Sequence, residues 1–190
     1  MIDPDDRECA AIAAGLRLIQ IREPALPTAR LASFAEAVLR LARPSGAIVV
    51  LNGHEDLARE LAVDGAHLSS ARLAQVERRP DFEWVGASCH ERSELERAAA
   101  LGLDYALLGA VRATPTHPEQ EGLGWPRFAD RVRELPIPVL ALGGLGAGDM
   151  EAARDAGAHG LAAIRGAWVQ SGSFAGGASP VSGGEDAGTR

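Results

Sequence analysis

Residues 101–125 read LGLDYALLGAVRATPTHPEQEGLGW. The apolar run at 105–108 predicts a buried strand, and a long polar loop follows it. This loop carries two hydroxyl side chains and an imidazole, at Thr114, Thr116 and His117. In parallel α/β proteins the carboxyl ends of the strands form the ligand site. The stretch therefore predicts a strand that delivers polar side chains to a binding site.

Short apolar strands followed by helices recur on both sides of this stretch. The predicted strands lie at 16–22, 47–51, 64–68, 84–88, 105–108, 137–142 and 160–165, and Thr28 is predicted to cap the helix behind the first of them. Such alternation predicts an α/β fold, a parallel sheet covered by helices. Polar residues at nearly every strand end favour a TIM (β/α)8 barrel over an open sheet, because only a barrel brings all strand ends to one mouth. The first strand is at most residues 1–3 and no helix follows residue 165, so we expect a barrel truncated at its first strand and last helix.

Composition and charge limit the classes of function. A chain of 190 residues, 46% of them hydrophobic, can bury one sizeable core. We assign residues 1–169 to the barrel and residues 170–190, rich in Gly and Ser, to a disordered tail. The net charge of −7 argues against nucleic acid or an anionic membrane as a partner. All 19 basic residues are arginine, which excludes a Schiff-base lysine and a P-loop. Two distant cysteines, Cys9 and Cys89, predict reduced thiols and a cytoplasmic protein.

Hydrogen-bond donors dominate the predicted strand ends, and carboxylates are scarce there. The candidate ligand-binding residues are Gln20, Arg22, Asn52, His67, Ser88, Thr114, Thr116, Gly143, Gly144 and Arg165. Such a set suits a phosphate or diphosphate, and paired glycines let backbone N–H groups approach an oxyanion. A structural interpretation stays open for several of them, namely a core histidine at His67 and tight turns at Asn52 and Gly143–Gly144. The five histidines show no paired metal-ligand spacing, which argues against zinc.

Several short motifs occur in a recognisable order along the chain. They are QIRE at 20–23, NG at 52–53, DGAHL at 64–68, GASCH at 86–90, DYALLGAVRATPTHP at 104–118, LGW at 123–125, IPVLALGGL at 137–145 and AGAHGLAAIRG at 156–166. This ordered set resembles the thiamine phosphate synthase / TenI superfamily over about residues 1–168. It is most similar to the branch found fused to Nudix hydrolases. The resemblance implies a TIM barrel that joins hydroxymethylpyrimidine diphosphate to thiazole phosphate and releases diphosphate.

The resemblance also implies roles for individual residues. Gln20, Arg22, Asn52 and Ser88 match groups that hold the diphosphate, and His67 matches the histidine of the third family strand. Thr114 and Thr116 match the loop over the thiazole, and Gly143–Gly144 matches the site for the thiazole phosphate.

The chain departs from the family pattern at the charged positions. The family uses magnesium, but its two aspartate ligands are Gly53 and Arg72 here, so we expect no metal ligand and name no certain cofactor. The two family lysines are replaced by Pro24 and His117. Arg72 and Arg165 are available to supply part of the missing positive charge.

Three hypotheses follow for the function. The first is a transferase that makes thiamine phosphate. The second is a TenI-like thiazole phosphate tautomerase, in which His117 or His67 would be the catalytic base because Ala110 stands at the family position. The third is a non-catalytic module that binds phosphate ligands and partners a Nudix hydrolase. Small phosphate or diphosphate ligands are the expected partners, with a Nudix domain and a second copy of the chain as further candidates.

Overall fold

The computed structural model describes residues 15–114 and 121–163. Within these residues seven parallel strands form one sheet in chain order, from β1 to β7. They are β1 (Leu18–Ile21), β2 (Ile48–Asn52), β3 (Gly65–Leu68), β4 (Trp84–Cys89), β5 (Tyr105–Gly109), β6 (Val139–Leu142) and β7 (Gly160–Ala162). The predicted α/β class and the parallel sheet are confirmed.

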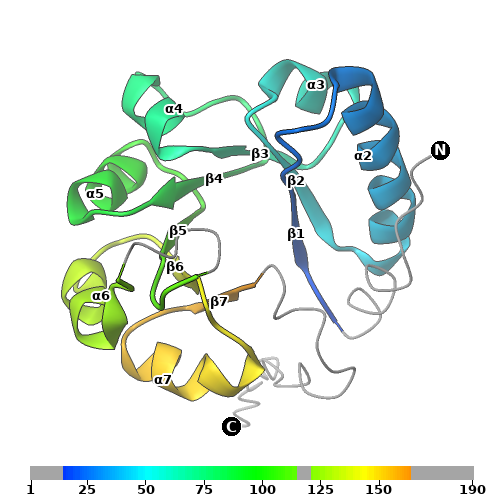
Figure 1. Ribbon diagram of the computed structural model, residues 1–190. Helices are drawn as coiled ribbons and strands as arrows, with labels where there is room; N and C mark the ends of the chain where they lie inside the picture. The colour runs from blue at the N-terminus through cyan, green and yellow to red at the C-terminus, as the bar shows by residue number, and fades with distance from the viewer. Residues whose placement is uncertain (1–14, 115–120, 164–190) are drawn as a thin grey trace, which may run out of the picture.

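The sheet curls, and the helices lie on its outer side (Figure 1). Within the described residues β1 pairs only with β2 and β7 only with β6, so the curl is that of an incomplete barrel. The predicted first strand at residues 1–3, the position after residue 165 and the tail at 170–190 lie outside the described residues.

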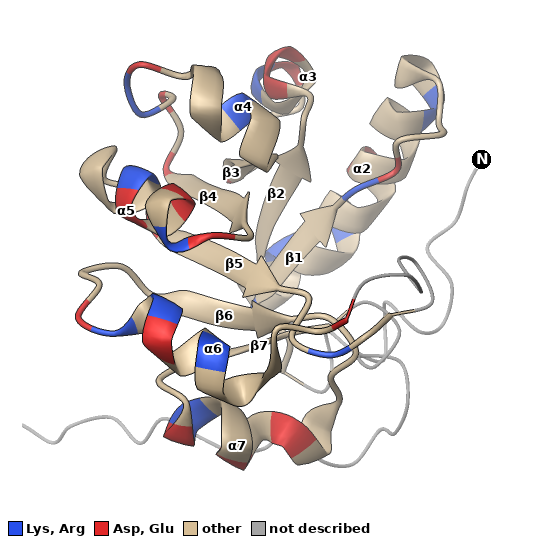
Figure 2. Ribbon diagram, turned by 60° about the vertical axis from the view of Figure 1, so that its left-hand side comes forward, with Lys and Arg blue, Asp and Glu red and all other residues tan. Residues whose placement is uncertain are grey.

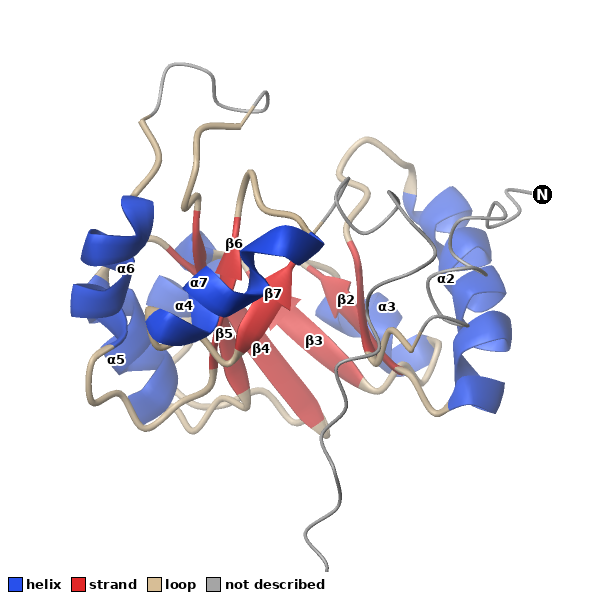
Figure 3. Ribbon diagram, turned by 90° about the horizontal axis from the view of Figure 1, so that it is seen from below, coloured by secondary structure: helices blue, strands red, loops and turns tan. Residues whose placement is uncertain are grey.

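Six α-helices and two short 3-10 helices connect the described strands. The α-helices are α2 (Thr28–Ala42), α3 (Glu55–Glu60), α4 (Ser70–Gln75), α5 (Arg92–Ala100), α6 (Gly124–Val132) and α7 (Met150–Asp155). The 3-10 helices are η1 (Arg43–Ser45) and η2 (Ala147–Asp149). Figure 3 shows the helices packed around the strands. None of the described helices is long and apolar enough to cross a membrane.

Alternate strand residues pack outward against the helices and build two apolar clusters. One cluster joins β1 and β2 to α2 and α3, with Val49, Leu51 and Leu31 among its members. The other joins β4, β5 and β6 to α5 and α6, with Leu108 and Phe128 fully buried. Because side chains alternate along a strand, the residues between these members face the concave side of the sheet. The concave side therefore holds the residues that are free to meet a ligand.

Side chains cap the amino ends of two helices, α4 and α5, whereas the amino end of α2 differs from the prediction. Ser69 caps α4, because its hydroxyl accepts a hydrogen bond from Arg72 N at 3.2 Å. Glu91 and Glu94 form a capping box at the start of α5. The prediction for Thr28 is wrong: it is the first residue of α2, the cap position is Pro27, and no side chain caps the helix. Proline supplies the helix-compatible φ of −59° but no side-chain acceptor.

Charged residues lie mainly on the helices and the loops that connect them to the strands (Figure 2). Several arginines there donate hydrogen bonds to backbone carbonyl groups. Arg97 donates three hydrogen bonds to the end of α4, to Leu73 O, Ala74 O and Val76 O. Two aspartates at the amino ends of strands bind backbone N–H groups of the neighbouring strand. Asp64 accepts a hydrogen bond from Val49 N at 2.7 Å, and Asp104 accepts one from Val85 N at 2.6 Å.

Candidate functional site

A row of concave residues crosses four neighbouring strands. The strand register pairs Asn52 with His67, His67 with Gly86, and Gly86 with Tyr105. Ser88 lies one pleat nearer the carboxyl end of β4. The parallel register thus brings together polar groups from β2, β3, β4 and β5, as the sequence predicts for Asn52, His67 and Ser88. Tyr105 and Gly86 are members that sequence reasoning missed.

His67 is the centre of a hydrogen-bonded trio. The Tyr105 hydroxyl lies 3.0 Å from His67 Nδ1, and Ser88 Oγ lies 2.9 Å from His67 Nε2. The imidazole is fully buried and the tyrosine is 4% exposed, whereas Ser88 is partly exposed. The hydroxyl of Ser88 is therefore the part of the trio that a ligand can reach.

Burial keeps the imidazole and the phenol of this trio uncharged near neutral pH. Burial, with a smaller contribution from the positive charge of Arg22, lowers the pKa of His67 to about 4. It also raises the pKa of Tyr105, with a smaller contribution from the negative charge of Asp104. An uncharged imidazole carries one N–H and one lone pair. One ring nitrogen therefore donates a hydrogen bond to its partner, and the other accepts one from its partner.

Gly86 makes the contact between Tyr105 and His67 sterically possible. A Cβ at residue 86 would lie 2.1 Å from Cζ of the Tyr105 ring and 2.3 Å from Cε1. The ring therefore crosses β4 over the glycine to reach β3. A glycine in a strand interior often marks such a close approach, and Tyr105 is the single tyrosine of the chain. The glycine and the single tyrosine are both visible in the sequence, but their contact can be recognised only once the strand register is known.

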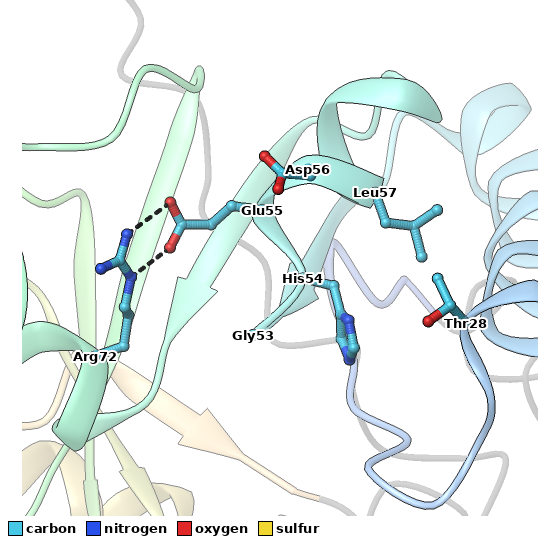
Figure 4. A pocket seen from close by; sticks show the side chains of 7 residues that line it. All are labelled: Thr28, Gly53, His54, Glu55, Asp56, Leu57 and Arg72. Carbon is cyan, nitrogen blue, oxygen red and sulfur yellow. Dashed lines mark hydrogen bonds and ion pairs between the residues drawn. The ribbon is translucent and has the colours of Figure 1, made fainter.

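A second feature is an open cavity of about 390 Å³ at the carboxyl ends of β2 and β3 (Figure 4). Its lining residues are Thr28, Gly53, His54, Glu55, Asp56, Leu57 and Arg72. Across it Arg72 donates two hydrogen bonds to the Glu55 carboxylate, at 2.7 and 3.3 Å. This hydrogen bond and the charge of Glu55 raise the pKa of Arg72. The predicted ligand-binding guanidinium is thus paired with an internal carboxylate.

The donor set at this cavity does not fit the magnesium ion that the family pattern implies. Gly53 offers no side-chain oxygen, and Arg72 places a positive charge where the second ligand would be. Glu55 is held by Arg72, and Asp56 pairs with Arg59 at 2.9 Å. No group of three or more potential metal-ligating side chains occurs within residues 15–114 and 121–163.

Gly143 and Gly144 lie at the end of β6 with positive φ angles of 102° and 67°. A Cβ on Gly143 would lie 2.6 Å from Ala110 Cβ, and one on Gly144 would lie 2.7 Å from Arg112 Cβ. Both glycines therefore pack under the loop that follows β5. This loop is held by Val111 N, which donates to Leu142 O at 2.9 Å, and by the Arg112–Asp149 ion pair at 2.6 Å.

The remaining predicted residues are distributed around this site. Gln20 is partly exposed on β1, Arg22 is exposed just beyond the strand, and Thr114 is partly exposed after β5. The other predicted residues, Thr116, His117 and Arg165, lie outside the described residues.

Comparison with known proteins agrees with the arrangement of strands and motifs. The family model described as thiamine monophosphate synthase matches residues 7–167. A protein of Geobacter sulfurreducens named putative thiamine-phosphate synthase is 35% identical over 81% of this chain and 74% of its own length. The thiamine-phosphate synthase of Chromobacterium violaceum is 37% identical over 83% of this chain and 77% of its own.

Solved structures show the same fold. The thiamine phosphate pyrophosphorylase of Pyrococcus furiosus superposes with a TM-score of 0.70 at 24% identity, over 85% of this chain and 79% of that one. The family match covers most of the chain, and the two relatives exceed 30% identity over most of their length. This chain belongs to the thiamine monophosphate synthase family.

Proposed function

We propose that the chain binds phosphorylated precursors of thiamine at the carboxyl ends of its strands, and that its transferase activity is weak. The ligand class follows from the relatives named thiamine-phosphate synthase. It also follows from the donors on the concave side, which suit anionic oxygens. Gln20, Arg22, Asn52 and Ser88 are the groups we assign to the diphosphate, and Thr114, Thr116, Gly143, Gly144 and Arg165 those we assign to the thiazole phosphate.

The Glu55–Arg72 ion pair is the observation that carries the second half of this proposal. A leaving diphosphate needs its developing charge neutralised, and bound cations with preorganised donors supply much of that stabilisation. In this chain Arg72 is already neutralised by Glu55 at 2.7 Å. Gly53 beside it adds neither a donor nor a metal ligand. We therefore expect this loss of positive charge to slow the chemical step more than it weakens ligand binding.

The same ion pair favours a second candidate, the non-catalytic module that binds phosphate ligands and assists a Nudix partner. Such a module needs the phosphate donors but no stabilisation of a leaving group. The tautomerase hypothesis with His67 as base has less support, because both ring nitrogens already contact Tyr105 and Ser88.

Isothermal calorimetry with the full chain separates these candidates. Hydroxymethylpyrimidine diphosphate is titrated with and without magnesium, thiazole phosphate follows, and product is then quantified by chromatography. We expect thiazole phosphate to bind with the same affinity in both buffers, with little thiamine phosphate formed. Magnesium-dependent binding of the diphosphate followed by fast product formation would show that the site works as an ordinary synthase. Failure of both ligands to bind would remove the proposed ligand class.

A further inference from the structure

The trio of Ser88, His67 and Tyr105 has the outline of an activated nucleophile. A serine lies within hydrogen-bond distance of an imidazole, and a third group contacts the other ring nitrogen. In a hydrolytic triad that third group is a carboxylate, which accepts the imidazole N–H and leaves the other nitrogen free to take the serine proton. Here the third group is a phenol, which can donate. The direction of the two hydrogen bonds therefore decides what the serine can do.

The positions of the protons on Tyr105 and His67 determine the direction of the two hydrogen bonds. The Tyr105 hydroxyl keeps its proton because burial raises the pKa of this residue, and the side chain is 4% exposed. Among the described residues the hydroxyl contacts no acceptor other than His67 Nδ1. If Nδ1 carried the imidazole proton, the phenol would have a buried proton without an acceptor, which is costly. Tyr105 Oη–H therefore donates to Nδ1, and His67 carries its proton on Nε2.

The protonated Nε2 then donates to Ser88 Oγ at 2.9 Å. Neither nitrogen of His67 retains a lone pair that could accept the serine proton. Ser88 accepts from the imidazole, so its own O–H points elsewhere, and the partly exposed Ser88 faces the concave side. The hydrogen bond from Nε2 also polarises this O–H, which strengthens it as a donor.

We propose that Tyr105 is a positioning residue that acts through His67 to make the Ser88 hydroxyl a one-way hydrogen-bond donor to an anionic oxygen of the bound phosphate or diphosphate. The ligand in this proposal rests on the proposed function, whereas the direction of the two hydrogen bonds does not. Gly86 is required for this arrangement, because only a residue without Cβ lets the Tyr105 ring reach β3.

The first experiment measures the tautomer of His67 without any ligand. The full chain is labelled with 15N-histidine, and long-range proton–nitrogen correlations are recorded near neutral pH. The His67 signals are assigned by their loss in His67→Gln. We expect an uncharged ring with its proton on Nε2. A proton on Nδ1, or a doubly protonated ring, would overturn the proposal, whatever ligand the chain binds.

The second experiment measures the affinity for inorganic diphosphate in Ser88→Ala, Tyr105→Phe and the double variant. Ser88→Ala is expected to weaken binding by about ten- to a hundredfold, as for loss of one hydrogen bond to a charged group, and Tyr105→Phe by about two- to fivefold. Because Tyr105 acts through Ser88, the double variant should bind no more weakly than Ser88→Ala. Ser33→Ala on α2, whose hydroxyl bonds only to Ala29 O among the described residues, is the matched control and should leave the affinity unchanged.

Additive losses in the double variant would mean that Tyr105 supports the fold without acting through Ser88. If the wild-type chain does not bind diphosphate, the proposed function and the donor role of Ser88 both fail. The Nε2 tautomer from the first experiment would then still establish the direction of the Tyr105–His67 bond, so the two failures are distinguishable.

Discussion

Gly86→Ala should destabilise the chain through one specific collision. The new Cβ would lie 2.1 Å from Tyr105 Cζ, 2.3 Å from Cε1 and 2.5 Å from Cε2. Carbon atoms pack at about 3.5 Å or more, so the ring has to move by about 1.4 Å. Its hydroxyl now lies 3.0 Å from His67 Nδ1, and a shift of that size carries it beyond hydrogen-bond distance.

Two terms set the magnitude of the effect. Overpacking a well-filled interior costs about 1–3 kcal/mol, and leaving a buried phenol and imidazole unpaired costs about another 1–3 kcal/mol. We therefore expect urea unfolding to show that the free energy of unfolding falls by about 2–6 kcal/mol. Gly148→Ala is the matched control, because no atom lies within 4 Å of its new Cβ and it should change stability by less than about 0.5 kcal/mol.

A double variant tests whether the ring is the cause. In a Tyr105→Ala background the collision partner is absent, so Gly86→Ala should cost less than about 1 kcal/mol. The reasoning is refuted if Gly86→Ala alone costs no more than the Gly148→Ala control. It also fails if the cost is the same with and without the Tyr105 ring, since the collision would then lie elsewhere.

Three further predictions concern charge and hydrogen bonding. Because burial lowers the pKa of His67 to about 4, against about 6.5 for an exposed histidine, the unfolded chain takes up this proton first as the pH falls. Stability should drop by about 3 kcal/mol across that window, and urea unfolding of His67→Gln should lack this part of the slope. Arg97→Met, which removes three hydrogen bonds to the end of α4, should cost about 1.5–3 kcal/mol in the same assay, whereas Arg40→Met on the exposed face of α2 should cost almost nothing. Glu55→Gln should leave the stability almost unchanged, because the pair is partly exposed and screened by solvent. It frees Arg72, so calorimetry without metal should show inorganic diphosphate binding about two- to fivefold more tightly, and an unchanged affinity would mean that Arg72 does not face the ligand.

Much of the fold could be predicted because its signals are local. The apolar runs that end on polar residues mark all seven described strands, although the structure makes several of them shorter, such as β1 at Leu18–Ile21. Alternation with helices then implies a parallel sheet. The prediction of a cap at Thr28 fails because capping depends on the backbone angle at one residue, which composition does not determine.

Of the candidate site, the sequence predicts several of the residues but not how they contact one another. His67, Ser88 and Asn52 could be named because polar residues at the ends of apolar strands stand out. The sequence indicates only that Tyr105 belongs to a buried strand, since an aromatic residue there is ordinary core. Gly86 stands out in the sequence only as part of the GASCH motif. Their roles depend on which strands are neighbours and on the register between them.

The sequence by itself determined the order of strands and helices, the absence of lysine chemistry and the family to which the chain belongs, because these follow from residue types and their spacing. Only the tertiary structure decided that Tyr105 reaches His67 across Gly86, over 38 residues of chain. It alone paired Glu55 with Arg72, 17 residues apart, at the expected metal position. Both contacts arise from the register of adjacent parallel strands and the curl of the sheet, and these are properties of the packed chain that no local pattern encodes.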